Sequence, residues 1–203
     1  MLEIYLVRHG ETPWNNEGRL QGSKDIPLSK RGFKQAERLA DRFEGLNFSA
    51  IYSSNLKRAE QTAATIARKN NMEVIQKKGF REISMGDWEG RLWEELNQEY
   101  PDTLQAWKEK PTMAAIPNCE GVVNVAKRGF KTLKNTALEH KDNDRILIVA
   151  HGLLISTILC RIEKIDLDDW FQMHQGNTAV NIIKFDGDQF ESCLLNCTKH
   201  ISE

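Results

Sequence analysis

Two short apolar segments, each followed directly by His-Gly, constrain the fold of this chain more than any other feature. Residues Ile4–Val7 run into Arg8-His9-Gly10, and residues Ile146–Ala150 run into His151-Gly152. Apolar runs of this length are typical of strands buried in a parallel sheet. Because ligands of such sheets bind beyond the carboxyl ends of strands, we expect both histidines to face one crevice. Each following glycine would allow a tight turn and let backbone N–H groups approach an anion.

The remaining apolar residues alternate between strand and helix spacing. Helices are expected after Leu28, after Leu56, over residues 122–138 and after His151, with further strands at 50–53 and 72–75. The tail predicts a hairpin at a sheet edge, turning at Asp186-Gly187-Asp188. This alternation predicts an α/β sandwich with a mostly parallel sheet.

Residues 86–120 depart from this alternation. Aromatic residues crowd the segment and prolines interrupt it: Trp88, Trp93, Tyr100, Pro101, Trp107, Pro111 and Pro117. We interpret it as a helical insertion over one end of the sheet. Trp88, Trp93, Trp107, Met85 and Met113 are expected mostly in its core, although some of them could touch substrate. The length of 203 residues suits a single domain, 1–203, that carries this insertion.

Charge and composition narrow the class of partner. The formal net charge of −1 predicts no general affinity for nucleic acid or for an anionic membrane, so an anion site would be local. The first residues form no signal-like leader, which favours a cytoplasmic protein. The four cysteines lack CxxC or zinc spacing, so we expect buried free thiols.

Arg58 adds a cation near a third strand end. It falls at the start of the helix that follows the strand at 50–53, so it could point to the same sheet edge. Taken alone, Arg58 is equally well interpreted as a solvated helix residue. Together with Arg8, it would form a two-pronged clamp suited to phosphate.

Five motifs follow one another along the chain. They are Leu6-Val7-Arg8-His9-Gly10-Glu11-Thr12, Gly18-Arg19-Leu20-Gln21-Gly22 with Asp25-Ile26-Pro27-Leu28, Ser53-Ser54 through Arg58 to Ala63, Glu82 with Gly86-Asp87-Trp88-Glu89-Gly90, and Ala150-His151-Gly152. Together they resemble the histidine phosphatase superfamily, in its phosphoglycerate mutase-like branch. The resemblance implies a three-layer α/β/α sandwich in which the insertion forms a substrate cap.

The resemblance also implies a role for each matching residue. His9 would be the nucleophile and become transiently phosphorylated, and Glu82 would donate a proton to the leaving oxygen. Three further residues would bind the phosphoryl oxygens: Arg8, Arg58 and His151. The rest of the phosphate pocket would be lined by Asn15, Gln21, Gly22 and Gly152.

Physical chemistry supports these roles. A neutral imidazole is a competent nucleophile near pH 7, and an alkoxide leaves poorly unless it is protonated. Phosphoryl transfer needs positive charge around the transferred group, which two arginines and two histidines would supply. The metal motif HExxH and the P-loop pattern are both absent from the sequence, so we expect no metal and no cofactor.

Two departures from the family pattern bear on the substrate. Cofactor-dependent mutases of the family usually have Asn after His-Gly and paired arginines in a longer insertion, whereas this chain has Leu153 and no adjacent arginines there. This difference favours a phosphatase. Phosphatase members commonly carry Gly-Glu-Ser where this chain has Cys119-Glu120-Gly121, which leaves the substrate less certain and removes a hydroxyl that could cap the next helix.

We therefore expect a metal-independent phosphomonoester hydrolase that acts through a phosphohistidine. Its substrate would be a small phosphorylated metabolite, such as a sugar phosphate, phosphoglycerate or α-ribazole phosphate. The alternatives are a cofactor-dependent phosphoglycerate mutase and a binding protein without catalysis; the complete set of implied catalytic residues argues against the latter. Both monomer and homodimer remain open, as does whether His174 reaches the pocket rim.

Overall fold

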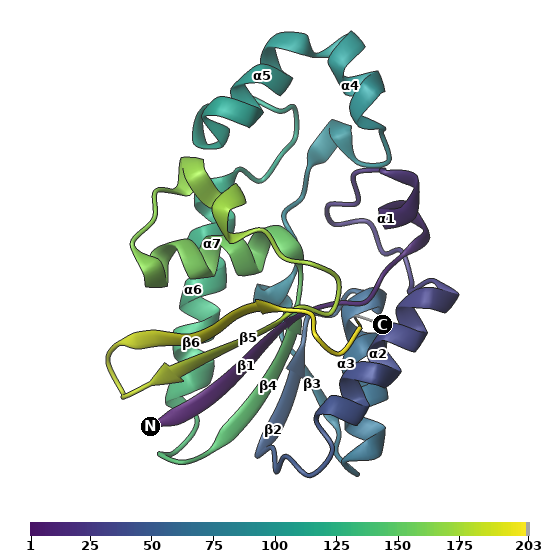
Figure 1. Cartoon of the computed structure of the whole chain (residues 1–203). Helices are drawn as coiled ribbons and strands as arrows, with labels where there is room; N and C mark the ends of the chain where they lie inside the picture. The colour runs from purple at the N-terminus through teal and green to yellow at the C-terminus, as the bar shows by residue number, and fades with distance from the viewer. Residues whose placement is uncertain (202–203) are drawn as a thin grey trace.

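The computed structural model describes residues 1–201, which are built around a six-stranded sheet of order β3-β2-β4-β1-β5-β6 (Figure 1). Four neighbouring strands are parallel, and β5 and β6 run antiparallel at one edge. The strands are β1 (Leu2–Arg8), β2 (Ala50–Ser53), β3 (Val74–Gln76), β4 (Arg145–Ala150), β5 (Val180–Phe185) and β6 (Phe190–Cys197). The edge hairpin and the mostly parallel sheet predicted from the sequence are confirmed.

Helices connect these strands and cover both faces of the sheet. The α-helices are α1 (Pro13–Glu17), α2 (Lys30–Arg42), α3 (Lys57–Lys69), α4 (Trp93–Glu99), α5 (Pro101–Glu109), α6 (Val122–Leu138) and α7 (Gly152–Glu163). Short 3₁₀ segments are η1 (Lys78–Phe80), η2 (Gly86–Trp88), η3 (Pro111–Met113) and η4 (Leu167–Met173). In the described part of the chain, no helix has both the length and the apolar character that crossing a membrane requires.

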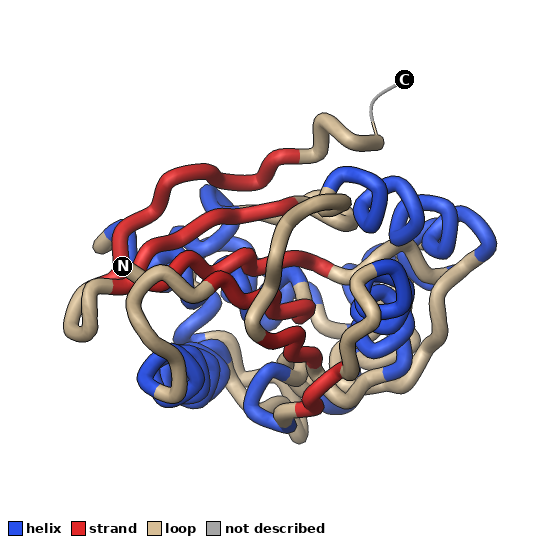
Figure 2. Tube along the Cα trace, turned by 90° about the horizontal axis from the view of Figure 1, so that it is seen from below, coloured by secondary structure: helices blue, strands red, loops and turns tan. Residues whose placement is uncertain are grey.

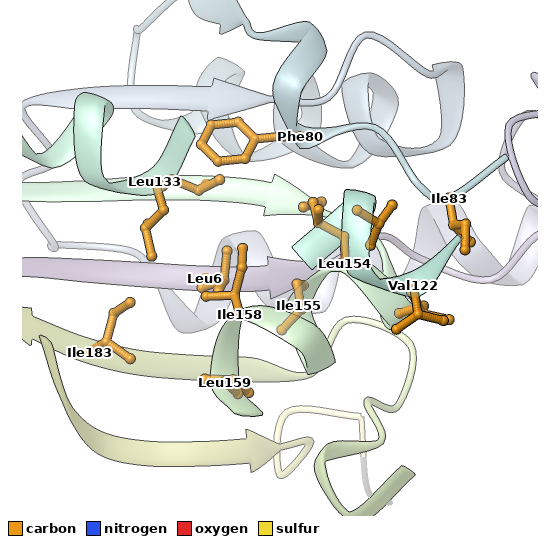
Figure 3. Packing of buried hydrophobic residues seen from close by; sticks show 14 of the residues in the cluster. Leu6, Phe80, Ile83, Val122, Leu133, Leu154, Ile155, Ile158, Leu159 and Ile183 are labelled. Carbon is orange, nitrogen blue, oxygen red and sulfur yellow. The ribbon is translucent and has the colours of Figure 1, made fainter. Parts of the chain in front are cut away.

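Alternation along the strands creates two cores. Ile4 and Leu6 of β1 pack with α6 and α7 on one face, where Leu154 and Ile158 lie against the sheet (Figure 3). Tyr5 and Val7 of β1 point to the opposite face of the sheet, which α2 and α3 cover. Helices therefore lie on both sides of the sheet (Figure 2), and the predicted three-layer α/β/α sandwich is confirmed.

The pairing of β1 with β4 positions the two His-Gly segments. Arg8 lies opposite Ala150 in the parallel register, and the His9 backbone N–H donates to the carbonyl oxygen of Ala150 at 3.0 Å. Both strands therefore end at the same edge of the sheet, and the residues that follow them are neighbours.

The segment from Gly86 to Glu120 extends beyond this edge and carries α4 and α5 (Figure 1). Trp88 is fully buried between Tyr100 and Trp107, with ring centroids 6.3 Å from each. The same apolar cluster continues through α7 to the sheet, so the insertion shares its core with the rest of the chain. Trp93 and Met113 are exposed, which corrects the expectation that they are core residues.

Several boundaries differ from the sequence prediction for local reasons. Strand β3 begins at Val74 because Asn71, with a φ of 51°, still belongs to the turn after α3. Helix α1 spans only five residues, too few for a periodic apolar pattern, and is fixed by a capping box between Thr12 and Asn15. The thiols are free as expected, but of the four only Cys160 is buried. Cys119 and Cys197 are partly exposed, and Cys193 is exposed because it lies on the outer face of the edge strand β6.

The turn after His9 depends on close packing between two glycines. Gly10 does not adopt a positive φ; a Cβ added there would lie 2.6 Å from the carbonyl oxygen of Gly32 in the first turn of α2. A Cβ on Gly32 would collide with the backbone carbonyl of Glu11. Glycine is therefore required at position 10 because a side chain would not fit against α2, and not because the turn needs an unusual backbone conformation.

We predict that Gly32→Ala lowers the free energy of unfolding by about 1–3 kcal/mol, because the backbone of the loop after His9 must move. Urea denaturation measures this change. Lys34→Ala, on the exposed side of the same helix, serves as the control and should stay within about 0.5 kcal/mol of wild type. Equal stability of the two variants would contradict the packing argument.

Candidate active site

A cavity of about 300 Å³ opens where β1 ends. Seven of the residues predicted for the site line it: Arg8, His9, Asn15, Gln21, Gly22, Arg58 and Glu82. His151 lies just behind the wall, fully buried, with its ring centroid 5.2 Å from that of His9. Gly152 adjoins Arg8, since a Cβ there would lie 3.4 Å from Nε of Arg8. The structure thus brings all nine predicted residues together.

His9 is held in one tautomer by the backbone. Its Nδ1 lies 2.6 Å from the carbonyl oxygen of Gly10, which can only accept, so Nδ1–H is the donor and Nε2 keeps its lone pair. Burial lowers the pKa of His9 well below its usual value, and the charges of Arg58 and Arg8 lower it further. His9 is therefore neutral at pH 7, with an available basic nitrogen.

His151 is held in the opposite tautomer. Nε of Arg58 donates to its Nδ1 at 3.2 Å, so the ring proton resides on Nε2. Burial, then Arg58, lower the pKa of His151 well below its usual value, and this ring is also neutral at pH 7. Its Nε2 is buried and has no hydrogen-bond partner within the described residues. It is thus a donor that an external acceptor would satisfy.

Arg58 is fixed at the base of the cavity. Its Nη1 donates to the carbonyl oxygen of Lys24 at 2.6 Å, and Nη2 donates to that of Gly22 at 2.8 Å. Only 1% of Arg58 is exposed, and burial lowers its pKa to about 10, so it stays charged at neutral pH. This placement confirms that Arg58 points back to the sheet edge and excludes the interpretation as a solvated residue.

Arg8 supplies the second fixed cation. Its Nη1 donates to the carbonyl oxygen of Gln175 at 2.5 Å, whereas its Nε is buried and has no partner among residues 1–201. Burial lowers the pKa of Arg8 too. Two charged guanidinium groups and two unsatisfied N–H donors, on Arg8 and His151, therefore converge on a site that an anion would complete.

Glu82 caps helix α7 from a distant part of the chain. Its Oε2 accepts from the backbone N–H of Leu153 at 3.1 Å, and its Oε1 accepts from that of Leu154 at 3.0 Å. His151 occupies the N-cap position without providing a side-chain cap. The carboxyl group is thereby held against a helix N-terminus and lines the cavity.

Arg128 holds the segment that carries Glu82, a role that the sequence did not reveal. Its guanidinium donates to the carbonyl oxygens of Gly79, Arg81 and Glu82 at 2.8–3.0 Å and pairs with the carboxylate of Glu120. A fork of this geometry requires arginine. Arg128 lies far from Glu82 in the sequence and carries no local signal for this contact.

Gly121 has a conformational reason to be glycine. Its φ of 81° and ψ of 141° belong to a region that residues with a Cβ rarely adopt, and α6 begins without a side-chain cap. The serine of the family pattern would be strained at this position. Helix α6 therefore starts without a side-chain cap, as the replacement of serine by glycine predicts.

The loop over residues 12–22 contributes Asn15, Gln21 and Gly22 to the lining of the cavity. Thr12 Oγ1 donates to Oε1 of Gln21 at 2.9 Å, and the backbone N–H of Thr12 donates to Oδ1 of Asn15 at 3.1 Å. Gly22 has a φ of 51°, and a side chain there would collide with Glu89.

His174 lines the cavity at its exposed rim. This placement answers the question, left open by the sequence, of whether His174 reaches the pocket rim.

No group of three or more His, Cys, Asp or Glu side chains within residues 1–201 is arranged to hold a metal ion. Beside His9 and His151, the positive charge comes from Arg8 and Arg58. The arrangement as a whole offers one imidazole lone pair, one imidazole donor, two cations and one carboxyl group to an anionic ligand.

The buried histidines predict a loss of stability at mildly acidic pH. In the unfolded chain, histidine side chains titrate near pH 6.5. In the folded chain, burial lowers the pKa of His9, His151 and His200, so these rings stay neutral. Burial, then the charge of Arg42, lower the pKa of His200 to about 4. Because the unfolded state binds more protons, the free energy of unfolding falls as pH drops below about 6.5. We expect Tm to decrease between about pH 7 and 5.5 and the decrease to be smaller in His151→Asn. An identical slope in the variant would contradict this account.

Comparison with known proteins places this geometry in a family. The model of the histidine phosphatase superfamily (branch 1) matches residues 4–198. The chain is 34% identical to phosphoserine phosphatase 1 of Hydrogenobacter thermophilus, over 100% of this chain and 96% of the relative.

Solved structures of related proteins have the same fold. The structure of YhfR from Bacillus stearothermophilus has a TM-score of 0.94 and 32% identity, covering 100% of both chains. A mutant phosphoserine phosphatase from Entamoeba histolytica in complex with phosphoserine has a TM-score of 0.85 and 31% identity, again over 100% of both chains. This chain therefore belongs to branch 1 of the histidine phosphatase superfamily and is a phosphatase.

Proposed function

We propose that this phosphatase hydrolyses small phosphate monoesters through a phosphohistidine formed on His9. The observation that carries the proposal is the hydrogen bond from His9 Nδ1–H to Gly10, because it leaves Nε2 as a neutral nucleophile inside a cationic cavity. Arg8 and Arg58 supply the positive charge that phosphoryl transfer requires, so the reaction needs neither metal nor cofactor.

In the first step, Nε2 of His9 attacks phosphorus and the bond from phosphorus to the ester oxygen breaks. Arg8, Arg58 and Nε2–H of His151 bind the three remaining oxygens, which satisfies the two buried donors without partners. Glu82 donates a proton to the leaving oxygen, so the product departs as an alcohol.

In the second step, water attacks the phosphorus atom of the phosphohistidine from the side that the product has left, opposite Nε2. Glu82, now deprotonated, takes a proton from this water, and the bond between phosphorus and Nε2 breaks. Inorganic phosphate is released, and His9 and Glu82 return to their starting protonation states. The remaining pocket residues orient the phosphate: Asn15, Gln21, Gly22 and Gly152.

We further propose that residues 1–203 act as one cytoplasmic domain, monomeric or homodimeric, with residues 86–120 as the substrate cap. Neither nucleic acid nor a membrane is needed as a partner. Leu153 at the cavity wall favours hydrolysis over the mutase alternative, since an apolar side chain there gives no hold on a phosphorylated product. Retention of the phosphoryl group, and dependence on a bisphosphorylated primer, would identify a mutase instead.

We predict that His9→Ala lowers chelator-resistant phosphate release from a panel of small esters by about a thousandfold or more, because no other group replaces the nucleophile. Phosphate release is measured colorimetrically. In parallel, the protein is incubated with an ester that carries a radioactive phosphoryl group, and the label attached to the protein is tested for loss in acid. Wild type should carry an acid-labile label that the variant lacks. His140→Ala, remote from the cavity, is the control. Equal release by His9→Ala and wild type would refute the mechanism.

We predict that Glu82→Gln lowers kcat/KM for alkyl phosphates by about 10²–10⁴-fold and for p-nitrophenyl phosphate much less. The nitrophenolate leaves without protonation, so only the alkyl ester depends on the acid. Glu94→Gln, which alters an exposed carboxylate in the same region, should leave both rates unchanged. Equal losses for the two esters would show that Glu82 acts by positioning alone.

A further inference from the structure

Four of the five tryptophans in the chain line the cavity beyond the phosphate-binding groups. Trp14 comes from α1, Trp93 from α4, Trp107 from α5 and Trp170 from η4, so four separate elements each contribute one indole. Aliphatic side chains, among them Leu20 and Leu153, line the same cavity. Such a lining favours a flat, apolar ligand group over a hydrated one.

Part of this aromatic wall is held in place before any ligand binds. Trp107 is 7% exposed, and its ring centroid lies 6.1 Å from that of Trp170 and 6.3 Å from that of Trp88 behind it. Trp14 packs over Gly90, where an added Cβ would come within 3.3 Å of the indole. Little side-chain ordering is therefore required when a ligand binds to the wall.

The same wall offers no unpaired cation to a second anionic group. Apart from the phosphate-binding residues, the cationic or basic side chains among the described lining residues are Arg19 and His174. Nε of Arg19 donates to the carboxylate of Glu17 at 2.8 Å, and Nη1 donates to the carbonyl oxygen of Gly90 at 2.9 Å. Partial burial, then the charge of Arg8, lower the pKa of His174 at the rim, which disfavours a charged ring there.

We propose that the tryptophan-lined part of the cavity binds the leaving group of the substrate, and that this group is aromatic and carries no carboxylate. The proposal rests on the function proposed above and specifies its substrate class: phosphate monoesters of aromatic alcohols. Phosphoserine and phosphoglycerate carry a carboxylate, which would enter a largely apolar wall without a cationic partner. These two monoesters are therefore poor ligands of this chain, although one relative is named as a phosphoserine phosphatase.

Binding to the catalytically silent variant His9→Ala tests the proposal without turnover. The probes are 2-phenylethyl phosphate and O-phosphoserine, which share an alkyl ester linkage and differ in the group that contacts the wall. Burial of the phenyl ring predicts a Kd about tenfold or more lower for 2-phenylethyl phosphate, measured by calorimetry and by quenching of tryptophan fluorescence. Equal affinity, or tighter binding of phosphoserine, would overturn the proposal.

A matched pair of substitutions in η4 locates the effect. Trp170→Leu removes an indole from the wall, whereas Phe171→Leu removes a neighbouring ring that is 55% exposed and lies outside the cavity. In the His9→Ala background, Trp170→Leu should reduce the preference for the phenyl ester at least about threefold, and Phe171→Leu should not change it. A preference that both variants retain would overturn the assignment of the wall.

The two levels of the proposal fail differently. Absence of turnover for every ester with wild type, while the aromatic preference in binding persists, would refute hydrolysis and leave the aromatic site intact. Turnover with a preference for phosphoserine would support hydrolysis and refute the aromatic site.

Discussion

Parallel pairing of β1 with β4 determines where the chemistry of this chain takes place. The register sets Arg8 against Ala150, so the two His-Gly segments leave the sheet side by side and their imidazoles meet at 5.2 Å. Burial at that edge keeps both rings neutral, while the two buried guanidinium groups remain charged. The positive charge of the cavity therefore comes from groups that change little between mildly acidic and neutral pH.

Two hydrogen bonds give chemically identical side chains different tasks. The carbonyl of Gly10 fixes the proton of His9 on Nδ1, and Nε of Arg58 fixes that of His151 on Nε2. One ring is thus an acceptor and the other a donor toward the same space. Exchange of these partners would reverse the two roles without altering the sequence of either His-Gly segment.

Local sequence patterns were sufficient for part of this site. Apolar strands that end in histidine predicted the positions of His9 and His151. The start of the helix after Ser53 left Arg58 equally open as a solvated residue, and only its combination with Arg8 favoured the site. Glu82 was different: its role followed only from the family resemblance, because it lies in a loop whose contacts with α7 and Arg128 span long separations. The sequence did not predict which tryptophans line the cavity, since their convergence depends on how the insertion folds over the sheet. Helix α1 was too short to leave a periodic signal.

The insertion is closed at its base. The backbone N–H of Glu120 donates to the carbonyl oxygen of Ser84 at 2.9 Å, and the carboxylate of Glu120 pairs with Arg128, which in turn holds the backbone of Glu82. The chain thus leaves the neighbourhood of Glu82 at Ser84 and returns to it at Glu120, nearly the same point. The entropic cost of such a closed segment depends only weakly on its length. Segments of other lengths and sequences can therefore be accommodated above this base without moving Glu82, so that substrate preference can diverge independently of phosphoryl chemistry.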